Sequence, residues 1–367
     1  MAMTAGIIGL PNIGKSTLFN ALTKAGALAA NYPFATIQPN VANVLVPDAR
    51  LQHIAQLVHP KRIVPTTFEF TDIAGLVRGA SRGEGLGNQF LSHIREVDAL
   101  LHVIRCFEED DVVHVEGSLN PLRDIETVEF ELTVADYDIV EKRLPKLAKQ
   151  VQLKADPMLY QELELLKRIE QALQAGKPIR TLALNDTEQR LIRGYGFITA
   201  KPIIYVANVS ENAWLTQKPG PLAQAVVAHA QAHQQEAVII SAQIEAELAT
   251  LEPNDKEEYL LAYGLNESGL DTLIAKAYTQ IGYQTFFTAG PQEARAWTFR
   301  KGMSAAECAG IIHSDFARGF IRAETVHVNA LLQAGSMTQA KEKGLVRAEG
   351  KGYTVQDGDI ILFRFNV

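Results

Sequence analysis

The stretch GIIGLPNIGKSTLFNAL, residues 6–22, decides the fold of the first part of the chain. A short β-branched run precedes Gly9, and apolar residues at helical spacing follow Ser16, so the pattern G-x-x-x-x-G-K-S lies between a strand and a helix. Loops of this kind turn backbone N–H groups toward phosphates at the start of a helix. The stretch therefore predicts an α/β nucleotide-binding domain with a phosphate loop.

The residues of this loop have separate expected tasks. We expect Lys15 to reach the β- and γ-phosphates and the Ser16 hydroxyl to bind Mg²⁺. The other residues expected to contact the nucleotide here are Gly9, Pro11, Asn12, Ile13, Gly14 and Thr17.

The whole chain has the composition of a soluble globular protein. It has 367 residues, enough for two or three domains, with 47% hydrophobic and 21% charged residues. We find no apolar run near the ~20 residues that a membrane span needs and no secretory signal, and we expect no membrane partner. Two cysteines, Cys106 and Cys308, are too few for a disulfide framework or a zinc site. These features predict a cytoplasmic protein. Because the net charge is -7, any binding to nucleic acid must use a local basic patch.

Two downstream segments predict the remaining Mg²⁺ and γ-phosphate contacts. Thr36, in NYPFATIQPN, lies 20 residues after Ser16, where a loop threonine can complete the Mg²⁺ shell. Asp72 follows the alternating strand TTFEF, so its carboxylate is expected at the strand's carboxyl end as a metal partner. The N–H of Gly75 is the expected donor to the γ-phosphate. Leu76 stands where a water-positioning glutamine usually follows, and the next glycines predict a loop that changes shape.

A later strand, AKPIIYVANVSE, predicts the base-recognition loop. It ends in Asn208-Val209-Ser210-Glu211, where GTPases carry Asn-Lys-x-Asp. Glu211 is one methylene longer than the aspartate that accepts two hydrogen bonds from guanine, and Val209 lacks the lysine stem. Guanine selectivity is therefore expected to be poor. Ser241 and Ala242 follow the next strand and match the last loop on the base side.

Residues 123–198 predict a helical hairpin inserted into the nucleotide domain. VEFELTVADYDIV and LYQELELLKRIEQAL both place apolar residues at steps of three and four, and Gly176 is a plausible end for the second arm. A basic stripe on the first arm could contact rRNA phosphates, although a solvated helix face remains an alternative. The stripe comprises Lys142, Arg143, Lys146 and Lys149, and Lys154 flanks it.

The last part of the chain predicts a separate module. A helix, DTLIAKAYTQIG, is expected to return the chain to the nucleotide domain before this module begins. From residue 281 to residue 367 ten Lys or Arg stand against eight Asp or Glu, although the whole chain is acidic. TVQDGDIILFRF predicts a turn at Asp357-Gly358 followed by a strand. We therefore place the nucleotide domain at 1–122 and 199–282, the hairpin at 123–198 and the last module at 283–367.

Together these motifs resemble the YchF-type Obg-like ATPases. The resemblance rests on GLPNIGKST, NYPFATIQPN, DIAGLVRGASRGEGLGNQFL, NVSE and a C-terminal GYTVQDGDIILFRFN, which looks like the end of a TGS domain, and it covers nearly the whole chain. It implies a P-loop NTPase domain with an inserted helical hairpin and a C-terminal β-grasp (TGS) domain. It also implies Mg²⁺-dependent ATP hydrolysis and binding to the ribosome, as the 50S subunit and the 70S particle.

The resemblance also implies roles for particular residues. The hydrophobic Leu76 replaces the catalytic glutamine, and a histidine from another loop, His114 in EEDDVVHVEG, acts in catalysis beside Lys15. An imidazole in such a polar loop could polarise a water. Asn12 resembles an asparagine that binds K⁺ beside the phosphates in related enzymes.

Two alternatives stay open. The chain could be a GTPase of the Obg class, because Glu211 can still accept hydrogen bonds from guanine. It could also be a nucleotide-regulated module that binds the ribosome and hydrolyses nucleotide only incidentally, which Leu76 favours.

Overall fold

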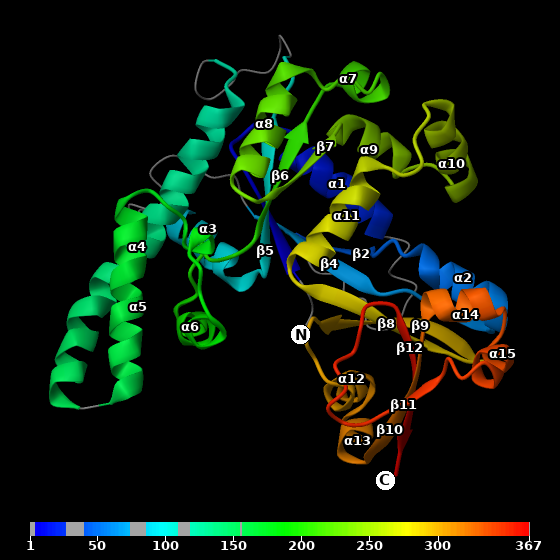
Figure 1. Cartoon of the computed structure of the whole chain (residues 1–367). Coiled ribbons are helices and arrows are strands. Elements are labelled where there is room, and N and C mark those ends of the chain that lie inside the picture. The colour runs from blue at the N-terminus through cyan, green and yellow to red at the C-terminus, as the bar shows by residue number, and fades with distance from the viewer. Residues whose placement is uncertain (1–3, 27–39, 74–85, 109–117, 155, 367) are drawn as a thin grey trace. The chain divides into compact units, whose positions relative to one another are not determined.

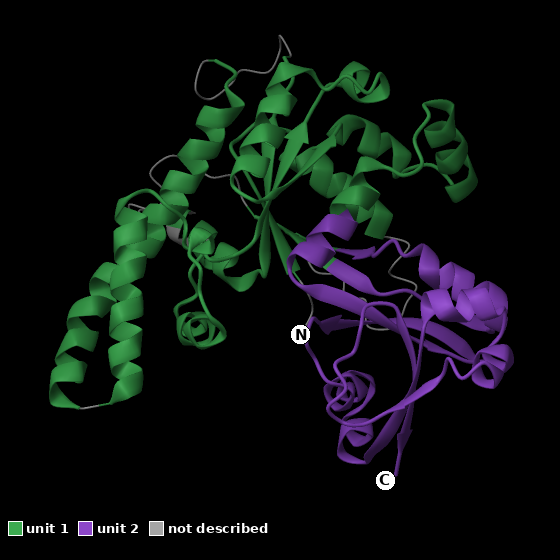
Figure 2. Ribbon diagram, viewed as in Figure 1, with its two compact units in different colours: residues 1–26, 37–42, 69–273 green, residues 27–36, 43–68, 274–367 purple. Residues whose placement is uncertain are grey.

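The computed structural model describes residues 4–26, 40–73, 86–108, 118–154 and 156–366. The chain divides into two compact units, which are described separately (Figure 2). Unit 1 comprises residues 1–26, 37–42 and 69–273, and unit 2 comprises residues 27–36, 43–68 and 274–367. Among the described residues, no helix has the length and apolar character needed to cross a membrane.

Unit 1 is built on a sheet with the strand order β2-β4-β1-β5-β6-β7 (Figure 1). The five strands from β4 to β7 pair in parallel. Every residue of β5 and β6 is buried, as expected for central strands covered on both faces. The carboxyl ends of these parallel strands lie at the same edge of the sheet, where α/β folds bind ligands. The strands are β1 (Thr4–Ile8), β2 (Val41–Leu45), β4 (Thr67–Asp72), β5 (Ala99–Arg105), β6 (Ile203–Asn208) and β7 (Glu236–Ile240).

Helices flank the strands of this sheet. The helix expected after residue 270 is present as α11. The helices outside the hairpin are α1 (Lys15–Gly26), α3 (Leu86–Glu96), α6 (Asp186–Ile192), α7 (Glu211–Leu215), α8 (Gly220–Ala232), α9 (Ala242–Leu248), α10 (Pro253–Ala262) and α11 (Gly269–Gln280), with short 3-10 turns at Ile179–Thr181 and Arg193–Tyr195. The last residues of α11, residues 43–45 of β2 and residues 67–68 of β4 are grouped with unit 2.

The predicted helical hairpin is present as α4 (Pro121–Leu153) and α5 (Pro157–Gln174), which lie side by side (Figure 1). The first arm begins two residues before the predicted boundary, because the Asn120 side chain accepts a hydrogen bond from the Arg123 N–H and Pro121 occupies the first helical position. The second arm ends before Gly176, whose φ of 70° is left-handed. Buried residues from both arms, among them Leu147, Leu163, Leu166 and Ile169, fill the space between the helices.

Unit 2 contains a mixed sheet with the strand order β11-β10-β12-β8-β9-β3. The central strands β12 and β8 are parallel, and antiparallel strands flank them, as in a β-grasp fold. The predicted turn is confirmed, because Gly358 has a φ of 87° directly before β12. The strands are β3 (Arg62–Val64), β8 (Tyr283–Ala289), β9 (Glu293–Arg300), β10 (Phe320–His327), β11 (Arg347–Glu349) and β12 (Asp359–Phe365). The helices are α2 (Ala49–Val58), α12 (Ala305–Ile312), α13 (Ser314–Arg318), α14 (Val328–Ala334) and α15 (Met337–Glu342).

The composition of unit 2 differs from the boundaries that we predicted. Residues 43–68 were expected in the nucleotide domain, but the structure groups them with the C-terminal part of the chain. Strand β3 pairs in parallel with β9, and Leu51 and Ile54 of α2 pack in one core with Phe287 and Ile360. Pairing between segments more than 200 residues apart carries no local signal in the sequence, which explains the difference.

Candidate nucleotide-binding site

The phosphate loop connects β1 to α1, as the motif predicts. Gly9 and Gly14 have φ values of 153° and 88°, which other residues rarely adopt. A Cβ on Gly14 would lie 2.2 Å from the Nδ2 atom of Asn208, and one on Gly9 would lie 2.7 Å from the Val103 carbonyl oxygen. Both glycines therefore permit a close approach of the loop to the ends of β5 and β6. Asn12 is left-handed as well, with a φ of 61°.

Lys15 and Asp72 meet where α1 begins and β4 ends. Their side chains form an ion pair, and both are largely buried, with 10% and 21% of the side-chain surface exposed. The Asp72 N–H donates to the Asn40 carbonyl oxygen at 2.9 Å, which holds the end of the strand. The loop lysine and the predicted metal partner, 57 residues apart, thus lie together. Ser16 follows Lys15 in the first turn of α1 and is exposed.

Asn208 ties the phosphate loop to the base-side loops. Its Nδ2 donates to the Ile13 carbonyl oxygen at 2.9 Å, and its Oδ1 accepts from the Ala242 N–H at 2.9 Å. Its own carbonyl oxygen accepts from the Cys106 N–H at 2.8 Å. The side chain is buried, so its hydrogen bonds are made in a low-dielectric setting where losing a partner is costly. Asn208 therefore acts as a brace between three loops, a role that its sequence position did not predict.

A pocket of about 660 Å³ opens beside this brace. Eight residues that the sequence predicted at the nucleotide line it: Asn12, Gly14, Thr17, Asn208, Val209, Glu211, Ser241 and Ala242. The remaining lining residues are Phe107, Glu108, Ser210, Asn212 and Gln243. The other predicted residues of the loop, namely Gly9, Pro11, Ile13, Lys15 and Ser16, do not line this pocket. A volume of this size suits a small-molecule ligand.

Phe107 lines this pocket, although the sequence analysis did not predict it there. The Arg105 guanidinium lies 4.8 Å from the centre of the Phe107 ring, and its Nε donates to the Phe107 carbonyl oxygen at 3.0 Å. Burial raises the pKa of the neighbouring Cys106 thiol to about 12, so this cysteine stays protonated. A signal did exist, because Phe107 lies two residues after the carboxyl end of the buried strand β5.

Helix starts shape the base-side loops. Ser210 caps α7, accepting from the Ala213 N–H at 3.3 Å, and Ser241 caps α9. Glu211 is the first residue of α7, and its side chain is partly exposed at the pocket. Val209 is buried, and its N–H donates to the Ile240 carbonyl oxygen. Both serine hydroxyls thus accept hydrogen bonds from backbone N–H groups in the first turn of a helix.

Four predicted residues lie outside the described part of the chain: Thr36, Gly75, Leu76 and His114. Their expected roles at the metal, the γ-phosphate and the attacking water stay predictions. Within the described ranges, no group of three or more His, Cys, Asp or Glu side chains could hold a metal ion.

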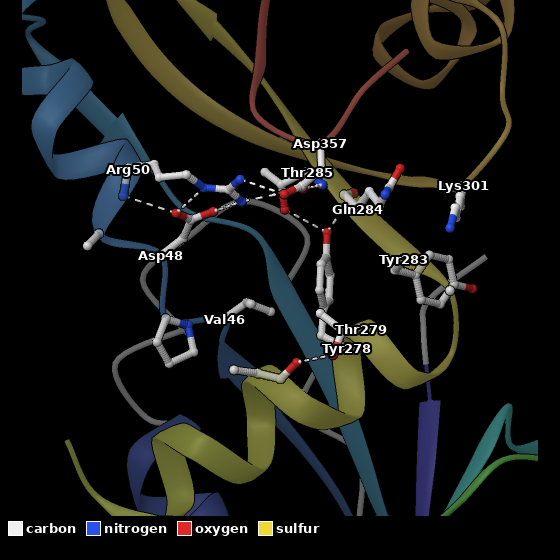
Figure 3. A pocket seen from close by; sticks show the side chains of 14 residues that line it. Val46, Asp48, Arg50, Tyr278, Thr279, Tyr283, Gln284, Thr285, Lys301 and Asp357 are labelled. Atoms are coloured by element: carbon white, nitrogen blue, oxygen red, sulfur yellow. Dashed lines mark hydrogen bonds and ion pairs between the residues drawn. The ribbon is translucent and has the colours of Figure 1, made fainter. Parts of the chain in front are cut away.

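A second pocket, of about 410 Å³, lies within unit 2 (Figure 3). Arg50 stands between two carboxylates there, donating to Asp48 at 2.8 and 2.9 Å and to Asp357 at 2.6 Å. The Tyr278 hydroxyl donates to the Gln284 carbonyl oxygen at 2.9 Å and also lies 2.9 Å from the hydroxyls of two threonines. These polar groups bind one another, so we read them as a clasp that fastens α2 to the C-terminal strands.

Comparison with known proteins agrees with this geometry. The chain is 54% identical to "Ribosome-binding ATPase YchF" of Bacillus subtilis (strain 168), and the match covers 100% of both chains. The chain belongs to the YchF family. A second full-length relative, "Ribosome-binding ATPase YchF" of Haemophilus ducreyi, is 48% identical.

Family models and a solved structure agree with this membership. Residues 283–366 match the YchF-GTPase_C family, described as "Protein of unknown function (DUF933)", and residues 4–138 match the family described as "50S ribosome-binding GTPase". The "Structure of the Schizosaccharomyces pombe YchF GTPase" superposes with a TM-score of 0.89 at 35% identity, covering 99% of this chain and 97% of that one. The predicted combination of a P-loop domain, a helical hairpin and a C-terminal β-grasp domain is thereby confirmed. The Bacillus subtilis relative is named an ATPase, whereas the Schizosaccharomyces pombe protein is named a GTPase.

Proposed function

We propose that the chain is a Mg²⁺-dependent ATPase of the cytoplasm that binds the ribosome and hydrolyses ATP to ADP and phosphate. The observation that carries this proposal is the Asn208 brace, which joins the phosphate loop to the base-side loops around one pocket. The names of the YchF relatives support hydrolysis and ribosome binding. The 50S subunit and the 70S particle are the proposed partners, with rRNA contacts through the hairpin or the TGS domain.

The proposed Mg²⁺ site combines oxygen donors of the kind that this ion prefers. Ser16 and Asp72 come from the described residues, and Thr36 completes the proposed set. Lys15 neutralises Asp72 and, with nucleotide bound, is proposed to contact the β- and γ-phosphates. The ion would offset the charge of the phosphate oxygens. A K⁺ ion beside Asn12 is proposed as a further cation.

Preference for ATP rests on the chemistry of the base side. Glu211 is longer than the aspartate that would accept both guanine donors, and Val209 supplies only an apolar surface. Phe107 offers a ring on which a purine can stack. These features support adenine without a guanine-specific pair of hydrogen bonds. The alternative, an Obg-class GTPase, rests on the remaining carboxylate of Glu211.

Catalysis is proposed to use His114, because Leu76 cannot orient a water. The change His114→Ala is expected to lower turnover while ATP affinity stays within a few-fold. Equal turnover in the variant and the parent would remove His114 from the mechanism.

Calorimetric titration with ATP and GTP, together with turnover in Na⁺ and in K⁺, tests the proposal as a whole. We expect ATP to bind more tightly than GTP, ribosomes to change the turnover, and K⁺ to raise it. Tenfold tighter binding of GTP, about 1.4 kcal/mol, would replace the ATPase by the GTPase. Ribosome binding without turnover under every condition would favour a binding module with incidental hydrolysis.

A further inference from the structure

The closed end of the α4–α5 hairpin carries a basic stripe that ends in an exposed leucine. Lys142, Lys146, Lys149 and Leu153 follow one another at steps of four, three and four residues, so they lie on one face of α4. All three lysines are exposed, and 85% of Leu153 is exposed. Lys154, the next residue, is exposed as well.

Exposed apolar side chains also stand at the start of the second arm, which follows Lys154 along the chain. Met158 and Tyr160, in the first turn of α5, are 51% and 58% exposed. They are not needed to hold the helices together, because Leu144, Leu147 and other apolar residues pack between the arms. Leu153, Met158 and Tyr160 are large, exposed and lie within eight residues of one another along the chain, and exposed apolar side chains that gather in this way are typical of a binding surface.

The charges of the hairpin are distributed unevenly. Its other basic residues have acidic partners: Arg143 pairs with Glu162, Lys167 with Glu164, and Arg168 with Glu188. Across the part of the chain that the structure describes, Lys142, Lys146, Lys149 and Lys154 form no such ion pair. The four free ammonium groups thus concentrate positive charge on one surface of a chain whose net charge is -7.

We propose that this surface is where the chain binds RNA of the ribosome. We call it the hairpin-end surface, and it comprises Lys142, Lys146, Lys149, Leu153, Lys154, Met158 and Tyr160. The inference rests on the proposed ribosome binding and deepens it by naming the surface and the partner's chemistry.

RNA fits the hairpin-end surface better than an acidic protein does. A row of unpaired lysines matches a phosphate backbone, which carries one negative charge per nucleotide. Exposed aromatic rings stack on unpaired bases, and Tyr160, in the first turn of α5, offers such a ring at the same end of the hairpin. Because the chain as a whole is acidic, its attraction to RNA must come from a local patch of this kind.

The first experiment is co-sedimentation of the full chain with purified ribosomes over a range of salt concentrations. The variant K146Q/K149Q/K154Q removes three charges from the hairpin-end surface. The charge-matched control K341Q/K343Q/K351Q removes three exposed lysines from unit 2. We expect the hairpin variant to bind at least tenfold more weakly, with a salt slope lower by about one for each lysine that contacts phosphate. The control is expected to retain parental binding.

A second pair of variants tests the apolar part of the hairpin-end surface. Tyr160→Ala is expected to weaken ribosome binding about tenfold with an unchanged salt slope, because stacking is lost and no charge is removed. Phe130→Ala is the matched control, since Phe130 lies on α4 and is 64% exposed. Circular dichroism and ATP affinity are expected to match the parent for every variant, because all the substituted side chains are exposed.

The outcomes separate this inference from the proposed function. If the parent does not co-sediment with ribosomes, ribosome binding itself fails. If the parent binds and K146Q/K149Q/K154Q binds equally well, only the hairpin-end surface is refuted. If the unit 2 control loses binding instead, the ribosome-binding surface lies on unit 2. Protein-free rRNA is expected to compete with ribosomes for the parent. Absence of competition, with binding still lost in the hairpin variants, would identify a ribosomal protein as the partner and overturn the RNA assignment.

Discussion

Glu245 is expected to make the packing of α9 against α11 dependent on pH. Its side chain is 1% exposed, and it accepts a hydrogen bond from the Gly269 N–H at 2.8 Å, at the start of α11. Burial, and after it the nearby Asp271 carboxylate, raise the pKa of this carboxyl from 4.5 to about 7, although backbone N–H groups and Lys256 act in the opposite direction. Helix α9 begins at Ala242, which lines the candidate nucleotide pocket, so the same contact supports one wall of that pocket.

The sign and size of the effect follow from linkage. A carboxyl whose folded-state pKa is raised binds its proton more tightly in the folded state. Its contribution to stability is therefore fully present below the unfolded pKa, near 4.5, and is lost as the pH rises through about 7. The gap between the two values corresponds to about 3 kcal/mol at ~1.4 kcal/mol for each pH unit.

Hydrogen exchange of peptides from α9 and α11, measured from pH 5 to pH 8, tests this expectation. After correction for the intrinsic exchange rates, the opening free energy of the parent should fall as the pH rises. In Glu245→Gln this fall should be absent, because the amide does not titrate. Glu247→Gln, an exposed neighbour on the same helix, is the control and should follow the parent. An opening free energy with the same pH dependence in the parent and in Glu245→Gln would refute the reasoning.

Three further changes test the nucleotide site and unit 2. Asn208→Ala leaves two backbone groups without their buried partner, at about 1–3 kcal/mol for each; ATP affinity by calorimetry should fall at least tenfold, while Asn212→Ala, at the exposed side of the same pocket, should change it little. Phe107→Ala should weaken the binding of ATP and GTP alike and leave inorganic triphosphate binding unchanged, because the proposed stacking involves only the base. Equal loss for all three ligands would contradict stacking. Arg50→Met should lower the free energy of unfolding of the full chain by about 1–3 kcal/mol, because the Asp48 and Asp357 carboxylates then repel each other without a cation between them. Arg318→Met, whose side chain is 78% exposed, is the control for melting temperature, and an equal shift in both variants would exclude a special role for the clasp.

Much of the nucleotide site could be predicted because its signals are local. The phosphate loop needs glycines at two left-handed positions and a lysine at the helix start, and these requirements appear as a short motif. Continuous apolar runs, such as those of β5 and β6, predict buried strands. The residues at the end of each run are then expected at the edge of the sheet where ligands bind. Asn208 ends such a strand, and Asp72 ends β4, whose apolar residues alternate with polar ones.

The features of the site that the sequence did not predict depend on contacts between segments far apart in the chain. The sequence identified Asn208 as a base-loop residue, but only the folded chain brings its side chain between the Ile13 carbonyl and the Ala242 N–H. Phe107 was missed because a phenylalanine after a strand is common, and only the pocket distinguishes it.

By itself, the sequence determined the family, the phosphate loop, the hairpin and the C-terminal module, because each rests on residues close together in the chain. Only the tertiary structure decided that residues 43–68 join the C-terminal module, that Lys15 pairs with Asp72, and that four lysines of the hairpin have no acidic partner among the residues that the structure describes. The physical reason is the same in each case. Pairing of strands, ions and buried polar groups depends on distances in space, which a linear pattern does not contain, whereas turns, caps and helical periodicity depend on neighbours along the chain.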